Sequence, residues 1–72
     1  MKLNYIWIFI NENLKIKPFK TFREAKDYLI NIYDKDIKFI EYNKHNCCHI
    51  FSNSWNDEDI YIQKIDLRSF YE

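Results

Sequence analysis

Apolar residues dominate the start of the chain, in the stretch LNYIWIFI at positions 3–10. This run is dense in β-branched and aromatic residues and too short to cross a membrane as a helix, which predicts a largely buried strand. Alternate side chains of a strand point to opposite faces. One face then carries Leu3, Tyr5, Trp7 and Phe9, and the other carries Ile6, Ile8 and Ile10. A strand that is apolar on both faces is central in its sheet or is covered on its second face.

The next segment, residues 11–18, turns and runs briefly back as a short second strand. Leu14 and Ile16 alternate there with Lys15 and Lys17. Pro18 is expected to end any ladder of hydrogen bonds at that point, because proline has no backbone N–H to donate.

The clearest local signal is the tetrapeptide Thr21-Phe22-Arg23-Glu24, which matches the capping box. In that motif the threonine hydroxyl accepts from the third amide of the helix while the glutamate reaches back to the cap. A helix is therefore predicted to begin at Thr21. Its apolar face, read at helical spacing, holds Phe22, Ala25, Leu29 and Ile32, with Tyr28 and Tyr33 at the margins.

The remaining chain alternates in strand fashion over residues 37–42, 47–52 and 59–67. Asparagine-rich junctions at 43–46 and 53–56 separate these runs. With no glycine in the chain, asparagine is the residue best able to adopt the left-handed backbone of a turn. The sequence thus predicts a single α+β domain over residues 1–72, with one helix on an antiparallel sheet of about four strands and the second face of the sheet partly open.

The chain length limits what this fold can bury. A domain of 72 residues buries only about 60% of the surface that its unfolded chain exposes. The chain is 19% aromatic, and rings supply a large buried area for each residue. We expect a folded but marginally stable domain, of the kind that a metal or a partner subunit often stabilises.

The formal net charge is zero, but the two halves of the chain differ. Residues 1–38 carry eight basic and five acidic side chains, and residues 39–72 carry three basic and six acidic ones. This dipolar distribution argues against a uniformly basic nucleic-acid binder and against an acidic mimic of DNA.

No secretory signal and no membrane-spanning segment is expected from the sequence. The apolar run at positions 5–10 ends in Asn11-Glu12-Asn13 without a small-residue cleavage site, and it is far shorter than the roughly 20 residues that span a bilayer. We expect a cytoplasmic protein, whose cysteines are thiols or metal ligands rather than a disulfide.

Four potential metal ligands gather in the stretch KHNCCHI at positions 44–50. They are His45, Cys47, Cys48 and His49. Zinc suits a mixture of thiolate, imidazole and carboxylate ligands. In a regular strand Cys47 and His49 point one way and Cys48 the other, so acidic residues 57–59 or a second copy of the chain would have to complete a structural zinc site. Alternatively, Cys48 is a small core residue and the other three face solvent.

The polar, acidic loop at positions 53–59 carries a tryptophan. An exposed tryptophan flanked by carboxylates is a favoured anchor of protein interfaces, with arginine or lysine of the partner as its complement. The interface residues predicted by this pattern are Trp55, Asp57, Glu58 and Asp59. In the alternative, Trp55 folds inward over the edge of the sheet and the acidic run is a solvated turn.

Basic residues recur over positions 15–26, with Phe19 and Phe22 among them. They are Lys15, Lys17, Lys20, Arg23 and Lys26. Such a run can follow a phosphate backbone, which would make binding to DNA or RNA steeply dependent on salt. More often it is the solvated side of a helix whose phenylalanines belong to the core. A small nucleic-acid-binding regulator is therefore the second hypothesis.

Catalysis is the least supported class of function. Catalytic loops commonly use glycine for close backbone approach, and this chain has none. A nucleophilic Cys–His pair would have to come from neighbours in one strand without an orienting group. We expect the protein not to be an enzyme.

The composition is rich in Ile, Asn, Lys, Tyr and Phe and poor in Gly, Ala and Pro, as in A/T-rich genomes. In size, composition, one-helix-plus-sheet pattern and lack of catalytic apparatus, the chain resembles small proteins with which phages and mobile elements of low-GC bacteria block host defences, anti-CRISPR proteins among them. The resemblance is one of type and carries over no functional residue. It implies an inhibitor that docks on a Cas9-like nuclease of the bacterial host and obstructs guide or target loading.

The leading hypothesis is thus a non-enzymatic protein-binding inhibitor. Its expected partner is a Cas nuclease rather than nucleic acid or a membrane. The expected state is a monomer or a metal-linked homodimer.

Overall fold

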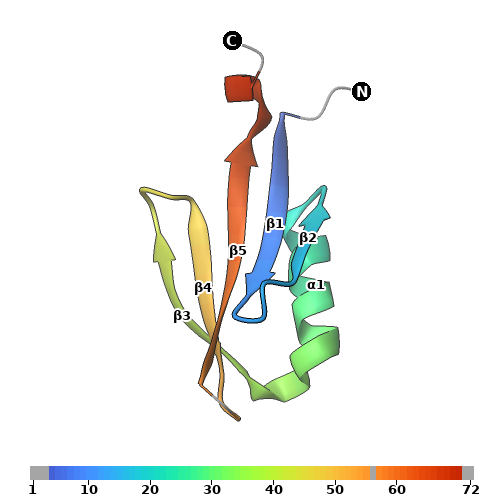
Figure 1. The fold of residues 1–72 in the computed structure, drawn as a ribbon, viewed down its shortest axis with the longest axis vertical. Coiled ribbons are helices and arrows are strands. Elements are labelled where there is room, and N and C mark those ends of the chain that lie inside the picture. The colour runs from blue at the N-terminus through green and yellow to red at the C-terminus, as the bar shows by residue number, and fades with distance from the viewer. Residues whose placement is uncertain (1–3, 56, 71–72) are drawn as a thin grey trace.

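Five strands and one helix form the fold in the computed structural model, which describes residues 4–55 and 57–70. In chain order the elements are β1 (Tyr5–Asn11), β2 (Ile16–Phe19), α1 (Phe22–Tyr33), a 3₁₀ turn (Asp34–Asp36), β3 (Ile37–Asn43), β4 (Cys48–Asn53), β5 (Glu58–Asp66) and a second 3₁₀ turn (Leu67–Phe70). The strands make one antiparallel sheet in the order β2-β1-β5-β4-β3, beside which α1 lies (Figure 1). The predicted α+β class is confirmed, with five strands where about four were expected. Leu3 and Asn56, assigned above to a strand and a turn, lie outside the described residues.

The additional strand is β2, at one edge of the sheet. Its Pro18 lies opposite Ile8 of β1, so pairing continues past the residue that was expected to end it. An edge strand tolerates proline because the missing N–H can be on the side that has no neighbour. The same feature protects this edge from pairing with a further strand.

The helix begins where the capping box predicts. The side chain of Thr21 accepts a hydrogen bond of 3.2 Å from the backbone N–H of Glu24. Ala25 and Leu29 of α1 are fully buried, as expected, whereas Ile32 is 43% exposed. The placement of Ile32 in the buried face was wrong, since in the last turn of α1 it is Tyr33 that packs against the core. Within the described residues, no helix is long and apolar enough to span a membrane.

The turns use asparagine differently from the prediction. The left-handed backbone falls on other residues, with φ of 61° at Leu14, 50° at Cys47 and 56° at Asp57. The asparagine side chains instead accept backbone hydrogen bonds within these turns. Asn43 Oδ1, for example, accepts from His45 N at 3.0 Å, and Asn11 and Asn53 act in the same way. The short amide side chain thus stabilises each turn while a neighbour takes the unfavourable conformation.

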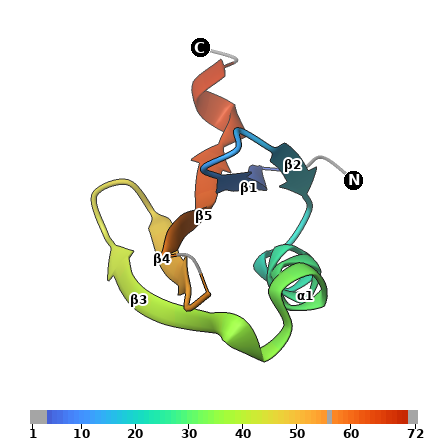
Figure 2. The same cartoon turned by 60° about the horizontal axis from the view of Figure 1, so that its bottom comes forward.

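The core lies between α1 and one half of the sheet. It is formed by Phe9, Ala25, Leu29, Phe51, Ile60 and Ile62. Helix α1 contacts β1, β2 and β5, and the β3–β4 hairpin extends away from it (Figure 2). One half of this sheet face is therefore covered by a helix, and the other half is not.

Candidate functional site

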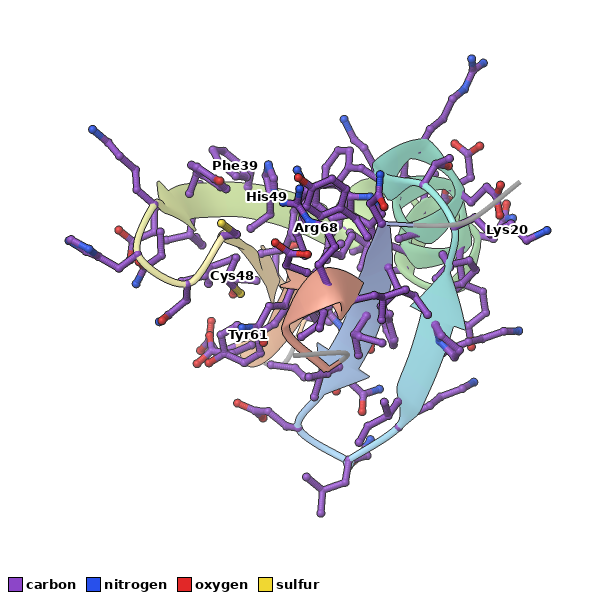
Figure 3. The ribbon with its side chains drawn as sticks, turned by 90° about the horizontal axis from the view of Figure 1, so that it is seen from above. Lys20, Phe39, Cys48, His49, Tyr61 and Arg68 are labelled. Carbon is purple, nitrogen blue, oxygen red and sulfur yellow. The ribbon has the colours of Figure 1, made fainter. Side chains whose placement is uncertain are left out.

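The stretch KHNCCHI forms the β3–β4 turn and the start of β4. Cys47 closes the turn, and its thiol lies 3.8 Å from the carbonyl oxygen of Lys44. Cys48 and His49 are the first two residues of β4. Figure 3 shows His49 on the same side of the strand as Phe39, and Cys48 on the opposite side.

The four predicted metal ligands are therefore divided between the two faces of the sheet. Cys48 is buried on the face away from α1, where burial raises the pKa of its thiol, and His45 is exposed in the turn. Among residues 4–55 and 57–70, no three His, Cys, Asp or Glu side chains gather closely enough to hold a metal ion. A structural zinc at these residues stays a prediction.

His49 lies within a box of aromatic rings on the α1 side of the sheet. The ring centroids of Phe22 and Tyr42 are 4.4 and 4.5 Å from that of His49, and those of Trp7 and Phe39 are 6.1 and 6.3 Å away. Helix α1 and strands β1 and β3 each contribute to this box. Within the described residues, the Nδ1 atom of His49 is buried and has no hydrogen-bond partner.

A hollow of about 420 Å³ adjoins this histidine. We call it the His49 groove, and it is lined by Phe22, Lys26, Ile37, Phe39, His49 and Phe51. Rings and aliphatic groups make most of the wall, and Lys26 adds a positive charge. Burial lowers the pKa of His49, and the ammonium group of Lys26 lowers it further. The groove is thus an apolar hollow that favours a neutral imidazole and lies beside a cation.

The groove exists because α1 lies mainly over β1, β2 and β5, so that only its first residue, Phe22, reaches His49 of β4. Phe39 is 52% exposed and Tyr42 is 45% exposed, although both lie on the face that α1 covers elsewhere. A register shift between Phe39 and Glu41 places Tyr42, rather than Glu41, opposite His49. Regular alternation would have placed Glu41 there, so the sequence analysis missed this aromatic cluster. The hydrogen bond between Tyr42 and the Cys47 thiol raises the pKa of the tyrosine, with a smaller contribution from burial.

The loop between β4 and β5 holds Trp55 outward. Trp55 is 81% exposed, so the alternative in which it folds inward over the edge of the sheet was wrong, and its role in an interface stays a prediction. The preceding residue, Ser54, donates from both its backbone N–H and its hydroxyl to the carbonyl of Asp36, each at 2.8 Å. Trp55 N in turn donates to Asn53 Oδ1 at 3.1 Å. An exposed indole is thereby fixed next to the start of β3.

The acidic residues predicted as partners of Trp55 do not all share its surface. Asp57 and Asp59 are exposed, whereas Glu58 is only 6% exposed. Glu58 forms a hydrogen bond with Tyr33. Burial raises the pKa of Tyr33; the bond to Glu58 raises it too, while the bond from Asn11 opposes the shift. The Glu58 carboxylate therefore belongs to the interior, and an interface at this loop would use Trp55, Asp57 and Asp59.

The basic stretch lies over β2 and the outer surface of α1. The ammonium groups of Lys15 and Lys17 are 5.4 and 4.5 Å from the ring centroid of Tyr28. Phe19 and Phe22 pack against the core. Two of the cations are thus engaged with a ring of the protein itself, and the two phenylalanines are not displayed for stacking on bases.

Comparison with protein-family models, with curated proteins and with solved structures gives no match to this chain. Its function is therefore inferred from the residues themselves. Two surface features stand out in the described structure, namely the His49 groove and the exposed Trp55 with its loop.

Proposed function

We propose that this protein is a small, non-enzymatic inhibitor that acts by docking on a larger protein, through the His49 groove and Trp55. We propose a Cas9-like nuclease as the target, because the chain resembles phage and mobile-element inhibitors in type. Docking near a guide-binding or target-binding channel would block loading by occupying space, and it requires no chemical step.

The observation that carries this proposal is the exposure of large apolar side chains around one concave site. Phe39 and Tyr42 keep about half of their surface in water at the rim of an apolar hollow. Aromatic anchors and the pockets beside them dominate the binding energy of protein interfaces. A domain with so few fully buried residues gains nothing in stability from leaving them uncovered, which favours a role in recognition.

Trp55 extends the same surface along β3. The loop that carries it is held to Asp36, the residue directly before β3, while Phe39 and Tyr42 lie further along that strand. The charges at the two ends differ, with Lys26 at the groove and Asp57 beyond Trp55. A complementary partner would present an acidic group toward the groove and a basic group toward the loop.

A cleavage titration tests this proposal directly. A purified Cas9-like nuclease is incubated with increasing amounts of the protein before guide RNA and target DNA are added, and the cleaved DNA is measured. Cleavage should fall in proportion to the molar ratio and stop near equimolar protein. Cleavage that persists at a large excess would exclude this target. Inhibition at a small fraction of equimolar protein would indicate turnover and refute a non-enzymatic mechanism.

Substitutions locate the docking surface in the same assay. Phe39→Ala and Trp55→Ala should each raise the concentration for half-inhibition by roughly ten-fold or more, as expected for interface anchors. Ile32→Ala is the matched control. Ile32 is 43% exposed and follows Tyr28 by one helical turn, on the side of α1 toward β2. Equal loss in all three variants, or none in any with an unchanged far-UV spectrum, would refute the surface proposed here.

A further inference from the structure

The face of the sheet away from α1 carries rows of apolar side chains. Read across β2, β1, β5, β4 and β3, one row is Ile16, Ile10, Tyr61, Ile50 and Glu41. The next row is Pro18, Ile8, Gln63, Cys48 and Asn43. Ile6 and Ile65 continue the pattern on β1 and β5. We call this surface the open face and define it by Ile6, Ile8, Ile10, Ile50, Tyr61 and Ile65.

The open face follows from the first strand of the sequence. Phe9 points toward α1 and is fully buried, whereas Ile8 and Ile10 point to the other side and are only half-buried. Figure 3 shows Cys48 and Tyr61 on this second side, with α1 and His49 on the other. In these two rows the charged residue is Glu41 of the edge strand β3, and a third row on the same side, Asp59, Ser52 and Lys38, is polar. An apolar centre with a polar rim is the pattern of a protein interface rather than of a solvated sheet.

We propose that the open face binds the open face of a second copy of this chain, so that the protein is a dimer of two stacked sheets. This interaction is separate from the His49 groove and Trp55. Two sheets that pack face to face lie about 10 Å apart and interdigitate the side chains of their inner faces. The six residues that define the open face carry no charge, so they can stack on a copy of themselves without bringing like charges together.

The open face is large enough for such a dimer. With about 3.3 Å per residue and about 4.8 Å between strands, the 33 residues of the five strands outline roughly 520 Å² of sheet. A standard interface buries about 800 Å² of each partner. Interdigitated side chains bury more than the flat outline of a pleated face, so the area matches that of a small, stable dimer.

The charged side chains on this side of the sheet favour one orientation of the two copies. Among the paired strand residues they are Lys38 and Glu41 of β3 and Asp59 of β5, whereas Lys15 and Lys17 lie on the α1 side. A two-fold axis parallel to the strands reverses their order, so that β3 of one copy lies over β2 of the other. An axis across the strands would place β3, with Glu41, over its own copy.

The gain from burying apolar surface also favours a second copy of the chain as the partner. Among residues 4–55 and 57–70, the buried core cluster contains six residues, and a chain of this length exposes a large share of its apolar surface when folded alone. Burying the open face would roughly double the number of aliphatic side chains removed from water. A second copy is the partner always present at the concentration of the protein itself.

Analytical ultracentrifugation of the untagged protein over a series of concentrations tests the dimer. The expected mass is twice the 9.0 kDa of the chain. Gln63→Lys should shift the distribution to the mass of one chain, because it places a charge on the middle strand of the sheet, between Ile8 and Cys48 on the side of the open face. The side chain of Gln63 is already polar, so this variant should fold, which its far-UV spectrum would verify. Tyr61→Lys should have the same or a larger effect.

Phe39→Lys is the matched control, because it adds the same charge on the α1 side of the sheet, where Phe39 is 52% exposed. This variant should remain a dimer. A wild-type protein that stays at the mass of one chain at every concentration would overturn the proposal. Dissociation by Phe39→Lys but not by folded Gln63→Lys would place the contact on the other face and overturn it as well. Nuclease inhibition measured with Gln63→Lys reports on the docking surface independently.

Discussion

The sheet face toward α1 has two halves that contain similar side chains in different surroundings. Beneath the helix, Phe9 and Ile62 are completely buried, and Tyr28 packs edge-on against Phe9 with centroids 5.1 Å apart. Beyond the helix, Phe39 and Tyr42 remain about half exposed around His49. The helix position, rather than residue type, decides which aromatic residues build the core and which are available for recognition. The first half should therefore govern stability, and the second should govern binding.

The largest expected loss of stability comes from a core substitution in the covered half. Leu29→Ala removes a fully buried side chain from the centre of the core and should lower the free energy of unfolding by about 2–5 kcal/mol, through lost burial and the cavity left behind. Phe39→Ala in the uncovered half should cost about 1 kcal/mol or less. Urea denaturation of both variants measures the difference. Equal losses would mean that the β3–β4 hairpin is as much a part of the core as α1.

Local patterns predicted the covered half well. The two faces of β1 follow from strict alternation, and the start of α1 follows from the cap at Thr21, because both depend only on neighbours in the sequence. The partial burial of Tyr33 rather than Ile32 in the last turn did not follow, since both fit helical spacing and only the packing of α1 on the sheet decides between them. The continuation of β2 through Pro18 was also missed, because its edge position is a property of the whole sheet.

The surroundings of His49 and Trp55 in the uncovered half depend on features that no local sequence pattern contains. Tyr42 reaches His49 only through the register shift after Phe39, and a one-residue shift exchanges the two faces of a strand. The exposure of Trp55 depends on contacts with Asp36, eighteen positions before Ser54. The sequence identified the histidine and the tryptophan as candidates, but the groove requires the strand order and the limited reach of α1.

A smaller loss of stability should follow from removing the N-cap of α1, the helix that covers the first half. Thr21→Ala removes the hydrogen bond to Glu24 N and should lower the free energy of unfolding by about 1 kcal/mol. Thr21→Ser keeps a hydroxyl and should preserve most of that stability, again measured in urea. A loss of the same size in both variants would show that the methyl group, not the cap, stabilises this end of α1. Because Thr21 lies next to Phe22, the alanine variant should also loosen the wall of the His49 groove.

The smallest effect should appear at His49, on the border between the two halves. Burial among the rings, and then Lys26, hold its pKa below the ordinary value of about 6.5. As the pH falls through that ordinary value, the unfolded chain takes up a proton that the folded protein resists, so the free energy of unfolding should decrease. The decrease should end once the pH is below the folded pKa. The measurement is urea denaturation at several values between about pH 7.5 and 5, above the range in which most carboxylates titrate.

Two variants separate His49 from the rest of the chain in that pH series. His49→Phe keeps a ring in the aromatic box and should flatten the dependence, because the group that resists protonation is gone. His45→Gln is the control for the loss of a histidine, because His45 is exposed in the β3–β4 turn and lies outside the aromatic box. A slope of unchanged size in His49→Phe would mean that His49 does not cause it, so that the aromatic box accepts a charged imidazole. His49 would then belong to the uncovered half rather than to its border with the covered half.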